Sequence, residues 1–229
     1  MIRLLRPAES EISGFLERAA ASGMGSTATF SHAEVGATAD PQAVTRLAGR
    51  YAIDHRRFVL GRGDDGFDAA RSALFAWRHF EIPWLELHGG EGDVRTGQVV
   101  ATLTRVFGLW LLNPCRVVYR KDDDSDRDPA TSGPRNASFA YGTLSGHVAR
   151  GEERFSLHLD PTTDEVVFEI LAFSRPAVSL TRLGRPWMRR IQRRFAVDAA
   201  NALARACGAE SAVEVGRGAE RLLAGRVGR

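Results

Sequence analysis

The sequence has little cysteine and almost no lysine, and it contains no long apolar run. Cys115 and Cys207 are the only cysteines among 229 residues, too few for a disulfide scaffold or a cysteine-based zinc site. No stretch approaches the roughly 18 to 20 apolar residues that a membrane span needs. The first residues also lack the apolar core of a secretory signal. These absences predict a cytoplasmic protein without a transmembrane segment.

The basic residues are unevenly distributed. The formal net charge is +3 and the isoelectric point is about 9.3. Between Arg175 and Arg205 there are eight arginines and a single acidic residue, Asp198. Such a segment fits either the solvated face of one helix or a surface for an anionic partner.

Apolar residues spaced three or four apart predict four helices. The expected segments are about 7–23, 41–48, 64–80 and, as the longest, 178–207. The longest carries one apolar stripe, formed by Leu180, Leu183, Trp187, Ile191, Phe195, Ala199 and Leu203. Pro186 removes one helix hydrogen bond, so we expect a kink or a late start at that position.

Between about residues 99 and 174 the apolar period changes to two, which is typical of strands. The expected strands are 57–60, 99–106, 115–119, 136–144, 152–159 and 165–173, with interruptions at Gly108 and at Asn113–Pro114. Short connections favour an antiparallel meander. The element order predicts an α+β fold in which a curved antiparallel sheet wraps around the C-terminal helix. A gap between sheet and helix is a place where hydrophobic ligands bind.

Several blocks of the sequence occur in the order of a known family. They are Ser31–Thr38, Gly61–Gly63, Ala76–Trp84, Gly108–Tyr119, Tyr141–His147, Gly151–Phe155 and Phe173–Pro176. On these blocks the chain resembles the YndJ-like family of bacteria and plants, a domain of unknown function related to the START and birch-pollen-allergen proteins (the SRPBCC group). The resemblance implies a bacterial protein with a START-like helix-grip domain at 27–207. It leaves an N-terminal helical extension at 1–26 and a C-terminal tail at 208–229.

Three motifs that suggest cofactors fail on physical grounds. Gly61–Gly66 matches a dinucleotide fingerprint, but Asp64 and Asp65 would repel a pyrophosphate at that helix terminus. Asp122–Asp128 lacks the glycine and glutamate positions of a calcium loop. No histidine pair has the spacing of a helical zinc site. We therefore expect neither a metal nor a cofactor.

The strongest polar pattern lies on one predicted strand. Glu152, Arg154, Ser156 and His158 share one face of it, and Glu169 lies on the next strand. If this face is concave, these groups line the cavity and orient a polar head group. If it is convex, they form an exposed ladder of ion pairs that stabilises little. We favour the exposed ladder.

Three functional hypotheses follow. The first is binding of a small hydrophobic or lipid-like ligand, with a site drawn from Trp77, Trp110, Tyr119, Tyr141, Arg154, Arg175, Trp187 and Phe195. The second is an enzyme of the cyclase, dehydratase or hydrolase type that uses the same cavity, with His147, Glu152 or Glu169 as acid or base. His147 equally fits a turn histidine that bonds to the backbone. The third is an interaction module whose basic C-terminal helix binds anionic lipid or nucleic acid. Nucleic acid is the less favoured of these two partners, because the interleaved aromatic residues of single-strand binders are missing there.

Overall fold

The structure is a computed structural model that describes residues 2–21, 30–123, 135–177 and 185–215, without the side chains of 185–188. Its helical elements are α1 (Glu9–Ala21), η1 (Ala37–Ala39), α2 (Pro41–Arg46), α3 (Gly63–Phe75), η2 (Arg78–Phe80) and α5 (Arg185–Ala206). Its strands are β1 (Ile2–Arg3), β2 (Ala52–Arg62), β3 (Leu85–His88), β4 (Val99–Val106), β5 (Leu109–Asp122), β6 (Arg135–Thr143), β7 (Ala149–Leu159), β8 (Glu165–Pro176) and β9 (Val213–Glu214).

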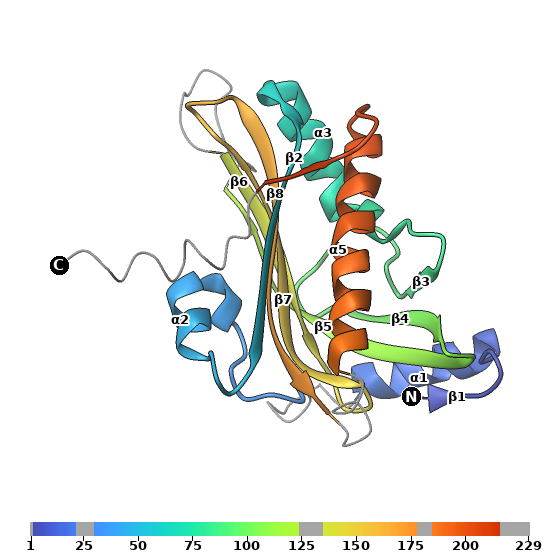
Figure 1. Cartoon of the computed structure of the whole chain (residues 1–229). Coiled ribbons are helices and arrows are strands. Elements are labelled where there is room, and N and C mark those ends of the chain that lie inside the picture. The colour runs from blue at the N-terminus through green and yellow to red at the C-terminus, as the bar shows by residue number, and fades with distance from the viewer. Residues whose placement is uncertain (1, 22–29, 124–134, 178–184, 216–229) are drawn as a thin grey trace.

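All these strands form one antiparallel sheet, in the order β3-β4-β5-β6-β7-β8-β2-β9, with β1 beside β5. Strands β3 to β8 follow one another as a meander, because each connection is short enough to return the chain beside the strand just made. The early strand β2 then closes on the late strand β8, with Ala52 opposite Ser174 and Arg62 opposite Glu165. The sheet curves strongly around α5, as Figure 1 shows. The predicted α+β helix-grip architecture is therefore confirmed.

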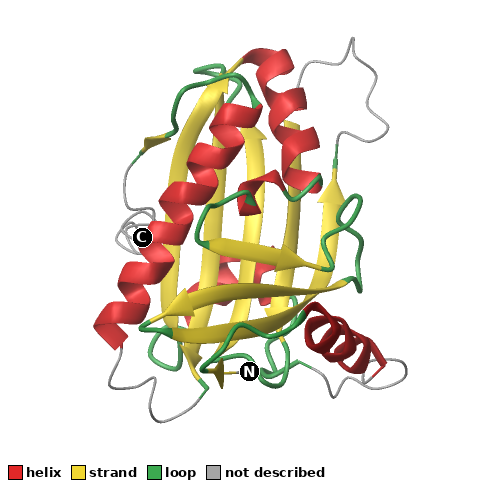
Figure 2. Ribbon diagram, turned by 90° about the vertical axis from the view of Figure 1, so that its right-hand side faces the viewer, coloured by secondary structure: helices red, strands yellow, loops and turns green. Residues whose placement is uncertain are grey.

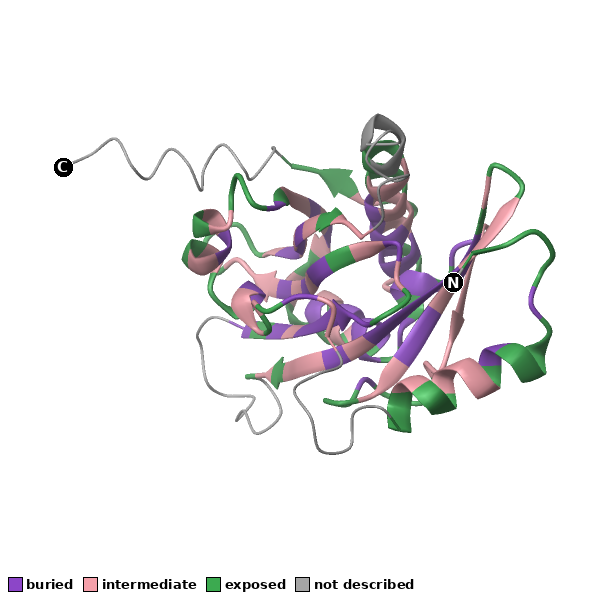
Figure 3. Cartoon of the chain, turned by 90° about the horizontal axis from the view of Figure 1, so that it is seen from below, coloured by how far each residue is buried: buried purple, intermediate pink, exposed green. Residues whose placement is uncertain are grey.

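Helices cover both faces of the sheet. The inner face, defined as the side that α3 and α5 pack against, carries the main core (Figure 2). That core includes the fully buried rings of Phe58, Phe67, Phe139, Phe155 and Phe168. The outer face is covered by η1 and α2, whereas α1 lies against β4 and β5. Viewed from below, buried residues follow the strands and the inner side of α5 (Figure 3). Within the described ranges, no helix is both long and apolar enough to cross a membrane.

The differences from the expected elements concern prolines, strand ends and the helix expected over 64–80. That helix is divided into α3 and η2, because Trp77 between them adopts a left-handed conformation with φ of 62°. Asn113–Pro114 does not interrupt the sheet, since β5 runs through it and the Pro114 carbonyl accepts a hydrogen bond from the Leu144 N–H at 3.1 Å. Helix α5 begins at Arg185, so Pro186 lies in the first turn, where its missing N–H costs no helical bond. The part of the expected helix before Arg185, with Leu180 and Leu183 of its apolar stripe, lies outside the described residues. The short strands β1 and β3 were not predicted.

Candidate functional site

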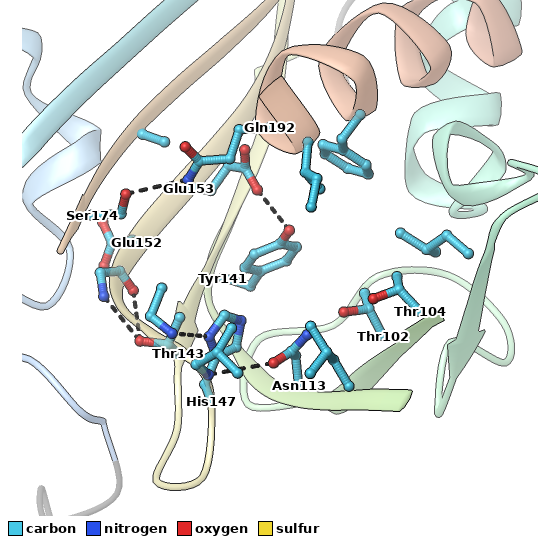
Figure 4. A pocket seen from close by; sticks show the side chains of 18 of the residues that line it. Thr102, Thr104, Asn113, Tyr141, Thr143, His147, Glu152, Glu153, Ser174 and Gln192 are labelled. Carbon is cyan, nitrogen blue, oxygen red and sulfur yellow. Dashed lines mark hydrogen bonds between the residues drawn. The ribbon is translucent and has the colours of Figure 1, made fainter. Parts of the chain in front are cut away.

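A pocket opens between the inner face of the sheet and the first half of α5 (Figure 4). Its volume is about 160 Å³. Its apolar wall includes Phe80, Trp84, Val106, Leu111, Ile191 and Phe195, and its polar groups include Thr104, Asn113, Tyr141, His147, Glu153 and Gln192. A cavity of about 150 Å³ with apolar walls holds one benzene molecule. The pocket therefore has room for one ring or a short chain.

Strand pairing brings two of the polar groups together. On β7, Glu153 shares the inner face with the core residues Phe155 and Leu157, because side chains alternate along a strand. Tyr141 lies directly opposite Glu153 on β6. Its hydroxyl donates a hydrogen bond of 2.7 Å to the Glu153 carboxylate (Figure 4). A carboxylate thus stands on an otherwise apolar face, at the wall of the pocket.

Burial changes the proton affinity of this pair. It raises the pKa of Glu153 to about 7, with a smaller contribution from Asp54, although the Tyr141 hydrogen bond acts in the opposite direction. Burial also raises the pKa of Tyr141 well above its usual range, so the phenol stays protonated. Among the described residues that line the pocket there is no lysine or arginine. The Glu153 carboxyl group therefore changes charge near neutral pH, and these described residues contain no cation to compensate it.

His147 lies in the same pocket, at the turn between β6 and β7. Its Nδ1 accepts a hydrogen bond from the Ala149 N–H at 2.9 Å. This bond assigns the ring proton to Nε2. Burial lowers the pKa of His147 to about 3. The neutral ring therefore donates a hydrogen bond and does not fit the general base of the second hypothesis. His147 fits the other hypothesis, a turn histidine that bonds to the backbone.

Glu152, the neighbour of Glu153, has its carboxylate on the outer face. The carboxylate accepts hydrogen bonds from the Gly36 N–H at 2.7 Å, the Thr38 N–H at 2.9 Å and the Thr38 hydroxyl. The residue is 2% exposed. It is thus neither an exposed ladder residue nor a cavity acid. It holds the segment at η1 onto the sheet.

Arg154 and Glu169 also lie on the outer face, where they form an ion cluster. Arg154 donates to Glu169 and to the Thr38 carbonyl, and His55 Nε2 lies 3.0 Å from the Glu169 carboxylate. Burial opposes ionisation of Glu169, yet the bonds and charges of His55 and Arg154 together lower its pKa to about 2. Glu169 is therefore ionised at neutral pH, and neither residue reaches the pocket. The outer face is therefore the convex one, as the second alternative assumed, but Arg154 and Glu169 are half-buried there and not fully exposed.

Of the aromatic residues and the two arginines predicted to bind a ligand, two line the pocket, as far as their side chains are described. These are Tyr141 and Phe195. Trp77 is 3% exposed in the core beside Phe80 and Phe139, and Trp110 packs near α1. Tyr119 bonds to Thr38 on the outer face, and Arg175 is exposed there, 5.1 Å above the Tyr51 ring. The side chain of Trp187 lies outside the described residues.

Glu153 is the charged pocket residue that the sequence analysis missed. The signal was available, because a charged residue stood at the period-two positions of Phe155 and Leu157. A carboxylate that shares a face with core residues loses its hydration, which is how functional sites raise the pKa of an acid. Thr104 and Asn113 were missed for another reason: strands carry many such residues, and only the three-dimensional curvature places these two at the pocket. Across the described ranges, no three His, Cys, Asp or Glu residues stand close enough to hold a metal ion.

The chain matches the model of one protein family over most of its length. Residues 31–202 match the family described as "Domain of unknown function (DUF1990)". A UPF0548 protein of Dictyostelium discoideum is 32% identical over 169 residues, which cover 71% of this chain and 76% of that one. A UPF0548 protein of Arabidopsis thaliana is 33% identical over 153 residues, covering 67% and 72%. One from Deinococcus radiodurans is 35% identical over 162 residues, covering 66% and 76%. The family therefore extends beyond bacteria, to plants and Dictyostelium.

Solved structures with a similar outline are much more distant. Ara h 8.0201 is 10% identical, with a TM-score of 0.39, and the match covers 69% of this chain and 95% of that one. A point mutant of norcoclaurine synthase from Thalictrum flavum, in complex with a transition-state analogue, is 13% identical, with a TM-score of 0.41, and the match covers 69% and 94%. Because these TM-scores are below 0.5, the fold assignment depends on the sheet order and the position of α5 described above.

Proposed function

We propose that this chain, which belongs to the DUF1990 family, binds a small molecule with one apolar ring or short chain in the pocket under α5. The single observation that supports the proposal is the Tyr141–Glu153 pair on the pocket wall. A buried polar pair with unused hydrogen-bonding capacity gives a ligand its orientation, and the apolar wall gives it affinity. The cytoplasmic location, the YndJ-like relationship and the domain limits at 27 and 207 stay predictions from the sequence.

The charge of the pocket narrows the class of ligand. Glu153 is neutral or negative near pH 7, and the pocket wall, as far as it is described, has no cationic side chain. An anionic head group would meet a negative carboxylate without a counter-charge, which costs free energy in a poorly solvated site. We therefore assign to the pocket a ligand whose polar group is neutral or cationic and donates a hydrogen bond. Fatty-acid anions, which the lipid-like hypothesis would include, fit less well.

The test compares phenol, benzene and benzoate as probes, with binding followed by protein NMR at pH 6 and pH 8. We expect phenol to bind more tightly than benzene, because its hydroxyl can donate to Glu153, and benzoate to bind most weakly at pH 8. The variant Ala172→Leu places a larger side chain in the pocket and is expected to lower phenol affinity at least tenfold. Ala33→Leu, at an exposed position, is the matched control. Equal binding of phenol to both variants would show that the pocket is not the site.

Catalysis is the second candidate function, because Glu153 has a pKa near neutral pH and contacts a protonated tyrosine. A group with such a pKa accepts and returns protons efficiently. This hypothesis replaces His147, Glu152 and Glu169 by Glu153 as the acid or base. Deuterium exchange at the carbon next to the carbonyl of phenylacetaldehyde tests it, since a pocket base would speed exchange in the wild type and Glu153→Gln would abolish the acceleration. Equal exchange rates in both proteins would reject catalysis and keep ligand binding as the only proposed function.

A further inference from the structure

One corner of the sheet gathers most of the exposed apolar side chains in the described part of the chain. Of the seven large hydrophobic residues that are exposed there, four belong to this corner. They are Ile2, Leu4, Leu5 and Phe107, which expose 45%, 80%, 82% and 75% of their surface. We name these four residues the apolar corner. Scattered single apolar residues are normal on a protein surface, but a cluster that exposes several large side chains marks an interaction site.

Strand pairing brings the two segments of the apolar corner together. Strand β1 pairs antiparallel with β5, with Ile2 opposite Leu111. The same direction carries Leu4 and Leu5 toward the turn that joins β4 to β5, where Phe107 lies. Phe107 and Gly108 adopt left-handed conformations, with φ of 51° and 79°. Strain at a residue such as phenylalanine is retained where the surrounding structure or a function requires it. The N-terminal segment and β5 lie side by side in Figures 1 and 3.

The apolar corner adjoins the pocket. Val106 and Leu111 stand on either side of the β4–β5 turn, and both line the pocket wall. Ile191 of α5 lines the same pocket. An apolar ligand that moves from the apolar corner into the pocket would therefore stay in contact with apolar side chains.

Cationic residues border the apolar corner. Arg3 lies between Ile2 and Leu4 in the chain and is exposed, with Glu11 3.9 Å away. Arg105 is exposed next to the turn, with its guanidinium 6.0 Å from the centre of the Trp110 ring. Protruding apolar side chains beside arginines are the pattern of proteins that lie on anionic membranes, where the apolar groups enter the acyl boundary and the arginines meet lipid phosphates.

We propose that the apolar corner docks on the surface of an anionic lipid bilayer and that the pocket exchanges its ligand there. The second half of this proposal rests on the proposed function. A second copy of the chain suits the corner less well than a bilayer does. A stable protein interface needs a complementary surface of about 800 Å² on each partner, whereas the corner is a turn and an extended segment that present single protruding side chains.

The test measures co-flotation of the full chain with vesicles of phosphatidylcholine and phosphatidylglycerol at a 3:1 ratio. We expect the wild type to float with the vesicles. Leu4→Ser, Leu5→Ser and Phe107→Ser combined should lower the bound fraction at least tenfold. The control combines Val35→Ser with Val213→Ser, two exposed apolar residues elsewhere, and should float as the wild type does. Arg3→Glu with Arg105→Glu should lower binding severalfold and remove the preference for phosphatidylglycerol over pure phosphatidylcholine.

Two further measurements separate the possible failures. Phenol binding without vesicles should be the same in the wild type and in the triple variant. If neither protein binds phenol but the wild type still floats with the vesicles, the pocket function is rejected and membrane docking is still supported. Light scattering reports the oligomeric state of each variant. A wild-type dimer that the triple variant lacks, without flotation of either protein, would overturn the proposal in favour of a second copy. Equal flotation of the wild type and the triple variant would also overturn it.

Discussion

The two faces of strand β7 treat neighbouring carboxylates in opposite ways. On the outer face, Glu152 receives three hydrogen bonds from the segment at η1, so both of its carboxylate oxygens have donors. On the inner face, Glu153 receives one hydrogen bond, from Tyr141, and burial raises its pKa to about 7. The comparison teaches that a carboxylate with several hydrogen-bond donors, such as Glu152, holds structure together. A functional site is indicated by the group that lacks sufficient partners.

The largest loss of stability is expected when Glu152, the carboxylate with several hydrogen-bond donors, is replaced. Glu152→Ala removes the acceptor of the buried Thr38 N–H and of the half-buried Gly36 N–H, and it leaves the Thr38 hydroxyl with Tyr119 as its partner. Each unsatisfied buried donor costs about 1 to 3 kcal/mol. We expect the free energy of unfolding to fall by about 3 to 4 kcal/mol, measured by urea titration. Ser156→Ala, on the same face of β7, should change it by less than about 0.5 kcal/mol. A small loss of stability in Glu152→Ala would mean that these hydrogen bonds do not hold the segment at η1 firmly on the outer face.

An intermediate effect is expected on the inner face, and it depends on pH. The pKa of Glu153 is raised in the folded state, so the folded protein binds the extra proton between about pH 4.5 and pH 7. The wild type should therefore lose about 2 to 3 kcal/mol of stability as pH rises through that range. Glu153→Gln should lack this loss and be the more stable protein at pH 8.

The difference between the two unfolding curves isolates this contribution. The lowered pKa values of His79 and His147, both about 3, act with the opposite sign in both proteins, since stability gained from a neutral histidine appears as pH rises toward 6.5. Glu81→Gln, at an exposed position, should leave the pH profile unchanged. Parallel wild-type and Glu153→Gln curves from pH 4.5 to pH 8 would contradict the asymmetry between the faces.

The smallest effect is expected at Arg175, which the sequence analysis placed among the ligand-binding residues. The residue is exposed, and its guanidinium lies over the Tyr51 ring. An exposed contact of this kind contributes about 0.5 to 1 kcal/mol. Arg175→Ala should therefore lower the free energy of unfolding by about 0.5 kcal/mol and leave phenol affinity unchanged by NMR. A tenfold loss of phenol affinity would show that Arg175 contributes to ligand binding, and the outer face would then not be purely structural.

The elements could be predicted from the sequence because their signals are local. The period of two in β4 and the apolar stripe around Ile191 and Phe195 depend on neighbouring residues alone. The site could not be assigned in the same way, since the direction in which the sheet curves decides which face of β7 becomes concave. The sequence showed that Glu152 and Glu153 point to opposite faces, but it could not show that η1 would cover the first and α5 the second.

The pairing of β2 with β8 has a consequence for the order in which the molecule is made. Arg62 and Glu165 are neighbours in the sheet but are 103 residues apart in the chain. Ribosomes add about 5 to 20 residues per second, so β2 is made roughly 5 to 20 seconds before its partner exists. During that interval Phe58 has no inner face to occupy. The pairing of β2 with β8 therefore cannot form until β8 has been made, so the sheet closes at this edge only after every strand of the meander has been synthesised.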